Sequence, residues 1–366
     1  MKRIAIVVSI FLAVIILGIL VIRVREIDTD VTKNRTKVGV VFNGELLDHS
    51  WGQSHYEGIE AAAEELNLEI LYRENVPEDE RCIPVMEELI DEGCRILVAD
   101  SFGYGEWELE VAKEHPEIYF YHATGVQESE NLATYFGRIY QMRYLTGIVA
   151  GLQTKTDQIG YVAAFPISEV NRGINAFTLG VRSVNPEAVV YVEWSNSWTG
   201  DEETEAASVK LLDAYDIDVL TMHTDSLKAL EEADKRGIWS IGYNIDNSAL
   251  FPDTYLTAAV WNWGAFYTPQ FLSCLRGKFH GRHYWDGAES GVIALAPLTK
   301  NVVPEAHSAL EQAQQRFEDG TFDVFYGPIS DRDGVIRIED GESMTDEAML
   351  NEFDWYVEGV IICDEE

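Results

Sequence analysis

Short apolar runs alternate with longer amphipathic segments along most of this 366-residue chain. In the first half, apolar runs occupy residues 37–42, 68–72, 95–99 and 118–121, with helical patterns at 54–66, 80–92 and 106–115 between them. The alternation restarts with runs at 158–164, 188–194, 219–222, 240–243 and 256–260 and helical patterns at 169–183, 203–215 and 226–236. Strands that alternate with helices of this length imply right-handed crossovers and a parallel sheet. The sequence therefore predicts an α/β protein with two doubly wound parallel-sheet lobes.

The expected lobes are residues 37–155 and 156–277, and a largely apolar helix at 140–152 leads into the second of them. Residues 278–366 contain Gly, Pro and Asp turns with short strand patterns, and we expect this segment to return to the lobes. Two such lobes with a cleft and a hinge between them are the architecture of type I periplasmic solute receptors, which close around a ligand.

The N-terminal segment, residues 1–26, is predicted to be a membrane anchor, and residues 27–36 a polar tether. Residues from Ile4 to Ile22 are apolar except for Ser9 and Gly18, close to the length needed to span hydrocarbon. An A-x-A cleavage pattern and a lipid-bearing cysteine are both absent, so an uncleaved transmembrane helix is favoured over a cleaved export signal. Basic residues flank both sides of the segment, so charge counting leaves its orientation open.

Composition and motifs exclude several classes of function. The 63 acidic against 27 basic residues give a formal net charge of −36, which repels nucleic-acid phosphates. The four cysteines are too scattered for a disulfide framework or a zinc knuckle. Phosphate-loop, dinucleotide, nucleophile-elbow and zinc-protease signatures are also missing. We therefore expect no metal, no cofactor and no enzymatic activity.

The turns that follow the predicted strands carry aromatic and polar residues. Ligands of open α/β sheets bind beyond the carboxyl ends of the strands. The aromatic candidates are Trp51, Phe102 and Trp198 for stacking and Phe165 as an apolar wall. The polar candidates are Asp48, Asn175, Asp225 and Asp246, with Asn262 as a weaker one; Arg172 could neutralise a carboxylate or be a solvated helix arginine. Flat rings beside hydrogen-bond acceptors indicate a small-molecule pocket, since stacking a base is worth about 1–3 kcal/mol.

Several motifs resemble the basic membrane protein family. They include Asp48-His49-Ser50-Trp51-Gly52, the helix from Tyr140 to Gly151, the strand from Ile159 to Pro166, and the stretches Arg172–Phe177, Ser183–Pro186 and His223–Ser226. Proteins of this family are substrate-binding components of ABC transporters, and they include receptors for purine bases and nucleosides. The resemblance also implies an exported body. Nucleoside receptors of the family tend to carry a lysine where this chain has Trp261-Asn262-Trp263.

The resemblance thus implies an extracytoplasmic receptor that is anchored in the cell membrane as a single-pass protein. It would bind a purine base or nucleoside, with an adenine-like base favoured, in a cleft between the lobes, and deliver it to an ABC transporter permease. Two alternatives stay open, a receptor for a sugar or another small polar solute and an enzyme that processes nucleosides. A membrane-tethered sensor on the same fold would differ only in its partner.

Overall fold

The computed structural model describes residues 35–363, which form two compact units. Unit 1 comprises the chain up to Val41 together with Ile59–Thr134 and Tyr267–His283. Unit 2 comprises Phe42–Gly58, Tyr135–Phe266 and the chain from Tyr284 onward. These boundaries differ from the contiguous lobes expected at 37–155 and 156–277, because each unit is assembled from separate stretches of the chain. One stretch matters most for the site: the segment after the first strand, residues 42–58, belongs to unit 2.

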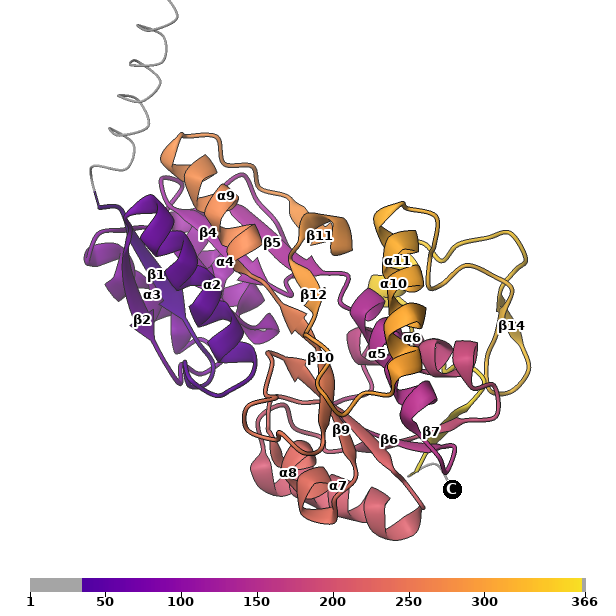
Figure 1. Ribbon diagram of the computed structural model, residues 1–366. Helices are drawn as coiled ribbons and strands as arrows, with labels where there is room; N and C mark the ends of the chain where they lie inside the picture. The colour runs from indigo at the N-terminus through magenta and orange to yellow at the C-terminus, as the bar shows by residue number, and fades with distance from the viewer. Residues whose placement is uncertain (1–34, 364–366) are drawn as a thin grey trace, which may run out of the picture. The chain divides into compact units, whose positions relative to one another are not determined.

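Unit 1 is built on a six-stranded sheet with the order β11-β5-β4-β3-β1-β2. Its strands are β1 (Lys37–Val41), β2 (Glu69–Arg73), β3 (Cys94–Ala99), β4 (Tyr119–Ala123), β5 (Leu132–Gly137) and β11 (His283–Asp286). β1 pairs in parallel with β2 and β3, and β3 pairs in parallel with β4. Helices α3 (Cys82–Asp91) and α4 (Gly105–Glu114) and the 3₁₀ turn η1 (Phe102–Tyr104) lie within unit 1, whereas α2 (Trp51–Leu66) and α9 (Gly264–Leu275) each cross a unit boundary, at Gly58 and Phe266 (Figure 1). The crossover helices are those expected from the apolar spacing.

Unit 2 is built on a seven-stranded sheet with the order β12-β10-β9-β8-β6-β7-β15. Its strands are β6 (Gln158–Ala163), β7 (Val189–Trp194), β8 (Val219–His223), β9 (Trp239–Asn244), β10 (Tyr255–Trp261), β12 (Ile293–Leu295) and β15 (Val360–Ile362). The pairs are parallel except for β10 with β12. Helices α7 (Asp201–Ala214) and α8 (Lys228–Arg236) lie beside the sheet, and α5 (Tyr140–Gln153) and α6 (Ser168–Val184) form a second pair (Figure 1). Alternating strands and helices with parallel pairing confirm the α/β fold.

Glycines bring α5 and α6 into close contact. A Cβ atom on Gly147 would lie 2.1 Å from the carbonyl oxygen of Phe177, and one on Gly180 would lie 2.0 Å from that of Tyr144. A side chain at either position would therefore push the two backbones apart. Gly147 lies in the stretch from Tyr140 to Gly151 that resembles the family, so close packing of the two backbones gives that stretch a physical reason.

The C-terminal part of the chain adds α10 (Pro304–Glu318), a small hairpin of β13 (Ile329–Ser330) and β14 (Ile336–Ile338), α11 (Asp346–Asn351) and the edge strand β15. β15 extends the unit 2 sheet because Val360 and Ile362 pair in register with Val190 and Val192 of β7. Among residues 35–363, no helix is long and apolar enough to cross a membrane. The apolar segment at 4–22, for which an anchor was expected, lies outside the described residues.

Candidate functional site

The carboxyl end of the unit 2 sheet gathers side chains from several strand exits. Phe165 follows β6, Asp225 follows β8, and Asn244 ends β9. Trp261 ends β10, and the segment 42–58 supplies Ser50 and Trp51 to the same unit. Parallel strands end at the same edge, so residues more than 200 positions apart in sequence meet there.

Asn244 is the hydrogen-bonding centre of this edge. Its amide nitrogen donates to Oδ1 of Asp225 at 2.7 Å and to the hydroxyl oxygen of Ser50 at 2.9 Å. Its amide oxygen accepts a hydrogen bond from the indole nitrogen of Trp261 at 2.9 Å. The residue is fully buried and has a left-handed backbone conformation with φ of 70°, which asparagine tolerates better than most residues. One side chain thus ties three segments together.

Asp225 is the acceptor that this network presents. Burial raises the pKa of Asp225 well above its ordinary value, and the nearby carboxylate of Asp48 raises it further, whereas the bonds from Asn244 and Ser50 lower it. Its backbone N–H donates to the carbonyl oxygen of Trp198 at 2.7 Å. Asp225 is therefore positioned by backbone and side chain together.

Three indole rings pack at the same edge. Trp261 and Trp263 are stacked with ring centroids 4.5 Å apart, and the ring of Trp51 meets each of them edge-on at 5.8 Å. Trp261 and Trp263 are buried, and the indole nitrogen of Trp263 donates to the hydroxyl of Ser54 at 3.2 Å. Trp51 is only partly buried, so it is the ring of this cluster that keeps exposed surface. Such edge-on contacts stabilise an aromatic cluster by about 0.5–1.5 kcal/mol per pair.

A second aromatic pair consists of Phe165 and Trp198, whose ring centroids lie 5.9 Å apart. Both rings are partly buried. Beneath them lies His223, whose ring centroid is 6.1 Å from that of Trp198. His223 is held between the hydroxyl of Tyr161 at 3.0 Å and the carboxylate of Glu169 at 3.1 Å. Burial lowers the pKa of His223, so the imidazole is neutral at neutral pH.

Asp48 caps the N-terminus of α2 with its carboxylate. Its carboxylate accepts hydrogen bonds from the backbone N–H groups of Ser50, Gly52 and Gln53 at 2.8–2.9 Å. These are donors that the first turn of a helix leaves without intrahelical partners. Burial raises the pKa of Asp48, and the three bonds act in the opposite direction. The structure thus gives Asp48 a capping role that also places Trp51.

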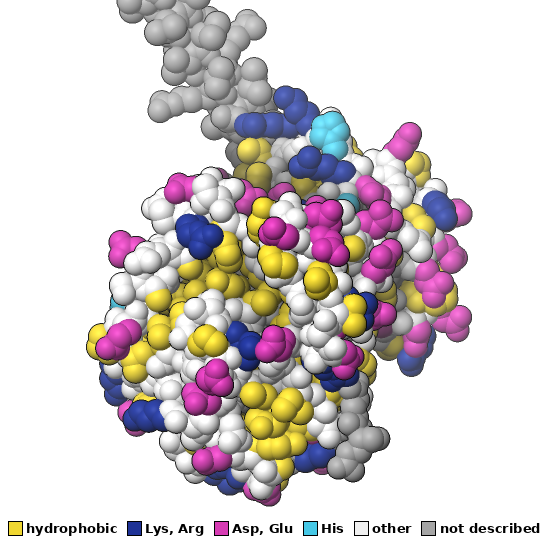
Figure 2. Space-filling view, turned by 90° about the vertical axis from the view of Figure 1, so that its right-hand side faces the viewer, with side chains coloured by type: hydrophobic (Ala, Val, Ile, Leu, Met, Phe, Trp, Pro, Cys, Tyr) yellow, Lys and Arg dark blue, Asp and Glu magenta, His cyan; other side chains and the backbone are white. Residues whose placement is uncertain are grey.

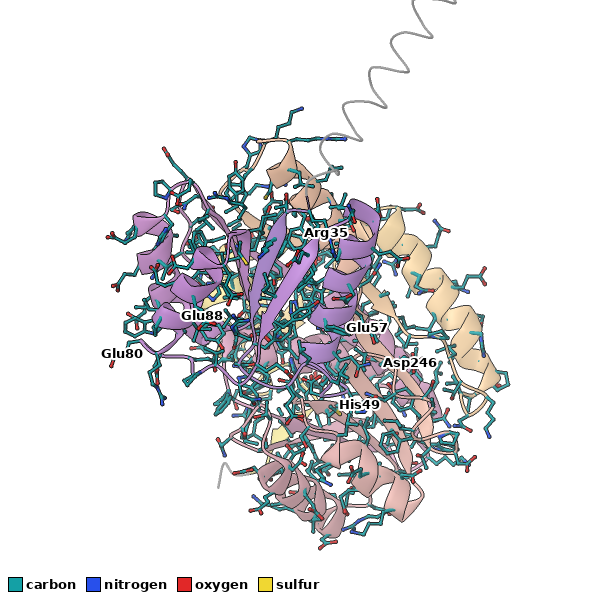
Figure 3. All side chains as sticks on the ribbon, turned by 90° about the vertical axis from the view of Figure 1, so that its left-hand side faces the viewer. Arg35, His49, Glu57, Glu80, Glu88 and Asp246 are labelled. Atoms are coloured by element: carbon teal, nitrogen blue, oxygen red, sulfur yellow. The ribbon has the colours of Figure 1, made fainter. Side chains whose placement is uncertain are left out.

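The other predicted residues lie apart from this network. Asp246, labelled in Figure 3, is exposed and accepts a hydrogen bond from the backbone N–H of Ser248. Asn262 is exposed and donates to the carbonyl oxygen of Gly291 at 3.0 Å. Phe102 belongs to unit 1 and is 63% exposed.

Asn175 and Arg172 hold the C-terminal segment. The amide of Asn175 donates to the carbonyl oxygen of Trp355 at 2.8 Å and accepts from the backbone N–H of Val357 at 2.9 Å. Arg172 is buried and donates to the carbonyl oxygen of Met349 at 2.6 Å, so it is not a solvated helix arginine. Both polar groups of Asn175 are thus used within unit 2.

Sequence reasoning did not place Asn244 and His223 among the ligand-binding candidates. Each directly follows a predicted strand and precedes a candidate aspartate by two positions, which was the available signal. Their roles depend on partners that are remote in sequence, such as Ser50 and Glu169. Within the described part of the chain, no group of three or more His, Cys, Asp or Glu side chains could hold a metal ion.

Comparison with known proteins agrees with this architecture. A family model described as ABC transporter substrate-binding protein PnrA-like matches residues 35–319. A purine-binding protein of Brucella abortus is 34% identical over 330 residues, covering 90% of this chain and 93% of that protein. A putative ABC transporter glucose-binding protein of Haloferax volcanii is 35% identical over 322 residues, covering 87% and 79%.

Solved structures match the fold. A transcriptional activator of the comK gene from Bacillus halodurans superposes with a TM-score of 0.69 at 22% identity, covering 78% of this chain and 99% of that one. An ABC transporter solute-binding protein from Conexibacter woesei superposes with a TM-score of 0.67 at 20% identity, covering 79% and 98%. The fold is therefore that of periplasmic binding proteins.

Members of the matched family are transport receptors and not enzymes, and they bind small-molecule ligands and a permease. The chain belongs to the Bmp family of ABC transporter substrate-binding proteins.

Proposed function

We propose that this receptor binds a purine base outside the cytoplasm and delivers it to an ABC transporter permease. The preferred ligand is an adenine-like free base, which we expect to bind more tightly than a nucleoside. The observation that carries the proposal is the joining of Asp225 to Trp261 through Asn244, with Trp51 packed on Trp261. A carboxyl group that can accept from a ring N–H or an exocyclic amine therefore lies in the same network as a partly exposed flat ring. The Brucella relative, named as purine-binding, supports the same ligand class.

The aromatic residues Phe165 and Trp198 supply a second flat surface near Asp225, since the backbone of Asp225 is bonded to Trp198. A purine stacks on such rings through its full π-face. Trp261 and Trp263 stand where nucleoside receptors of the family tend to carry a lysine. The indole N–H groups of Trp261 and Trp263 already donate to Asn244 and Ser54, so neither is available to donate to a ribose hydroxyl. This favours a free base over a nucleoside.

A sugar receptor is the second candidate, because the Haloferax relative is named as a putative glucose-binding protein at a similar identity. A sugar would use one aromatic face and the same carboxylate acceptors. The two candidates differ in how strongly their affinity depends on Trp51 and Trp198. A purine gains about 1–3 kcal/mol of binding free energy per stacked ring, whereas a sugar would use one aromatic face.

We also propose that residues 4–22 anchor the protein in the membrane with the α/β body on the extracytoplasmic side. The support is the apolar length of this segment and the absence of a lipid-bearing cysteine after it.

The ligand can be tested on gently purified full-length protein by mass spectrometry of released small molecules, followed by calorimetry with adenine, adenosine and glucose. Replacing Trp51 by Ala should weaken adenine binding about tenfold. Trp239→Ala is a matched control, because Trp239 lies at the amino end of β9, whereas Asn244 of the network lies at its carboxyl end. Glucose binding without adenine binding would refute the purine proposal and leave the receptor assignment intact.

A further inference from the structure

Glu169 lies at the start of α6, four positions after Phe165 of the second aromatic pair. The chain has 63 acidic residues, and Figure 2 shows Asp and Glu side chains spread over the face in view, so a carboxylate by itself marks no site in this protein. Glu169 differs because it bonds to a fully buried imidazole, that of His223, while 21% of its side chain stays exposed. Its carboxylate thus lies at the border between the interior of unit 2 and solvent.

The Glu169 carboxylate is held in its ionised form. Burial raises the pKa of Glu169, but the neighbouring His223, Arg172 and Arg143 lower it by more, so the pKa lies below the ordinary Glu value. Both arginines are buried in unit 2. The pKa of Asp225 is shifted in the opposite direction, because burial raises it and nearby carboxylates, Glu169 among them, raise it further. Of these two carboxyl groups, Glu169 is therefore the one that stays ionised.

The bond to His223 uses one oxygen of Glu169. An ionised carboxylate can only accept, so Nε2 of His223 carries the proton and donates to Oε1 at 3.1 Å. Nδ1 then accepts from the hydroxyl of Tyr161 at 3.0 Å, and both nitrogens of the neutral imidazole are used. α6 approaches this ring closely, since a Cβ atom on Gly173 would lie 2.9 Å from its Cε1 atom. Within residues 35–363, no second donor bonds to the Glu169 carboxylate, so a partly exposed acceptor remains.

Glu169 and Asp225 are attached to the same aromatic pair. The ring of His223, to which Glu169 bonds, lies 6.1 Å from the ring of Trp198 between centroids. The backbone N–H of Asp225 donates to the carbonyl oxygen of Trp198. A flat ligand that stacks on Trp198 therefore has two carboxyl groups beside it. Glu169 is the stronger acceptor of the two, because a hydrogen bond to an ionised group is charge-assisted, and it suits the most acidic N–H of the ligand.

A free purine base and its nucleoside differ in one N–H group. The base carries a hydrogen on a nitrogen of its imidazole ring, N9 in the common tautomer, whereas the nucleoside carries its sugar there. We propose that the Glu169 carboxylate accepts this ring N–H and thereby selects a free purine base against the nucleoside. The inference rests on the proposed purine function and adds a specificity-determining residue to it. A nucleoside leaves the carboxylate without its donor, and a polar group that loses its partner on binding lowers the affinity.

The test compares adenine with 9-methyladenine, which lacks the N9 hydrogen but carries no sugar, by calorimetry on the full chain at neutral pH. The wild type should bind adenine at least about tenfold more tightly. Glu169→Gln keeps an oxygen that can accept from His223 but removes the charge. Its adenine affinity should fall about tenfold, and its 9-methyladenine affinity less than about twofold. Glu187→Gln is the matched control, because it makes the same change at an exposed position between α6 and β7, and it should bind both ligands as the wild type does.

A wild type that binds 9-methyladenine as tightly as adenine would overturn the inference and leave the purine proposal standing. The same holds if Glu169→Gln weakens both ligands equally, which is the result expected of a purely structural role, or if it leaves their ratio unchanged. A melting curve shows whether the variant is folded, and the two ligands on the wild type decide the question if it is not. Binding of glucose without either purine would overturn the purine proposal and this inference together.

Discussion

Replacing Asn244 by Asp tests whether this residue is the centre of the candidate site. The two side chains have nearly the same shape, and the acceptor for the indole of Trp261 is retained. The donor that lies 2.7 Å from Oδ1 of Asp225 is replaced by an oxygen. A hydrogen bond to a carboxylate contributes about 1.5–3 kcal/mol, and the two close carboxylates also repel each other. We expect unit 2 to lose at least about 2 kcal/mol of stability at pH 8, or roughly 4–8 °C in Tm.

The loss should depend on pH in a defined direction. Burial already raises the pKa of Asp225, and a second carboxylate raises the upper pKa of the pair further because the two groups can share one proton. Above the ordinary Asp pKa, the native variant then binds more protons than its unfolded chain, so its stability falls as pH rises. The deficit of Asn244→Asp relative to the wild type should therefore be larger at pH 8 than at pH 5.

The assay is thermal and urea denaturation at both pH values, with adenine affinity measured alongside. Asn75→Asp is the matched control, because Asn75 is exposed and also has a left-handed backbone, with φ of 54°. The double variant Asn244→Asp/Asp225→Asn restores one donor facing one acceptor and should recover at least half of the lost stability. The reasoning is refuted if Asn244→Asp melts like the wild type at pH 8, or if the double variant is no more stable than the single one.

Three further outcomes are expected. Burial raises the pKa of Glu108 well above its usual value, and neither carboxylate oxygen has a hydrogen-bond partner among the described residues. The wild type should therefore lose about 1.4 kcal/mol of stability per pH unit above the ordinary Glu pKa. Glu108→Gln should remove this loss, as measured by urea denaturation from pH 5 to 8. Asn175→Leu should leave the backbone carbonyl of Trp355 and the backbone N–H of Val357 unpaired, which lowers stability by about 1–3 kcal/mol and speeds hydrogen exchange of residues 350–363. Lost adenine affinity without faster exchange would contradict this structural role. Because burial lowers the pKa of His223, stability should decline as pH falls below about 6.5, and His223→Gln should flatten that decline in a melting series.

The helices and strands of the crossover pattern were predictable from local spacing. The pattern at 140–152 corresponds to α5 (Tyr140–Gln153), and the run at 158–164 corresponds to β6 (Gln158–Ala163). α2 begins at Trp51, before the predicted start at Ser54, because the carboxylate of Asp48 accepts the first backbone donors of the helix. β5 (Leu132–Gly137) was missed, since a fully buried strand has no apolar–polar alternation to reveal it.

The sequence by itself determined the alternating α/β class, the acidic surface and the family, because these follow from local periodicity, charge and contiguous motifs. Only the tertiary structure decided which polar residues join the network at the carboxyl end of the unit 2 sheet and which hold the C-terminal segment. Asn175 and Asn244 are both buried asparagines, yet one holds the backbone of the C-terminal segment and the other orients Asp225 and Trp261. The difference lies in hydrogen-bond partners up to 194 positions away in the chain, and local sequence carries no information about such distant partners.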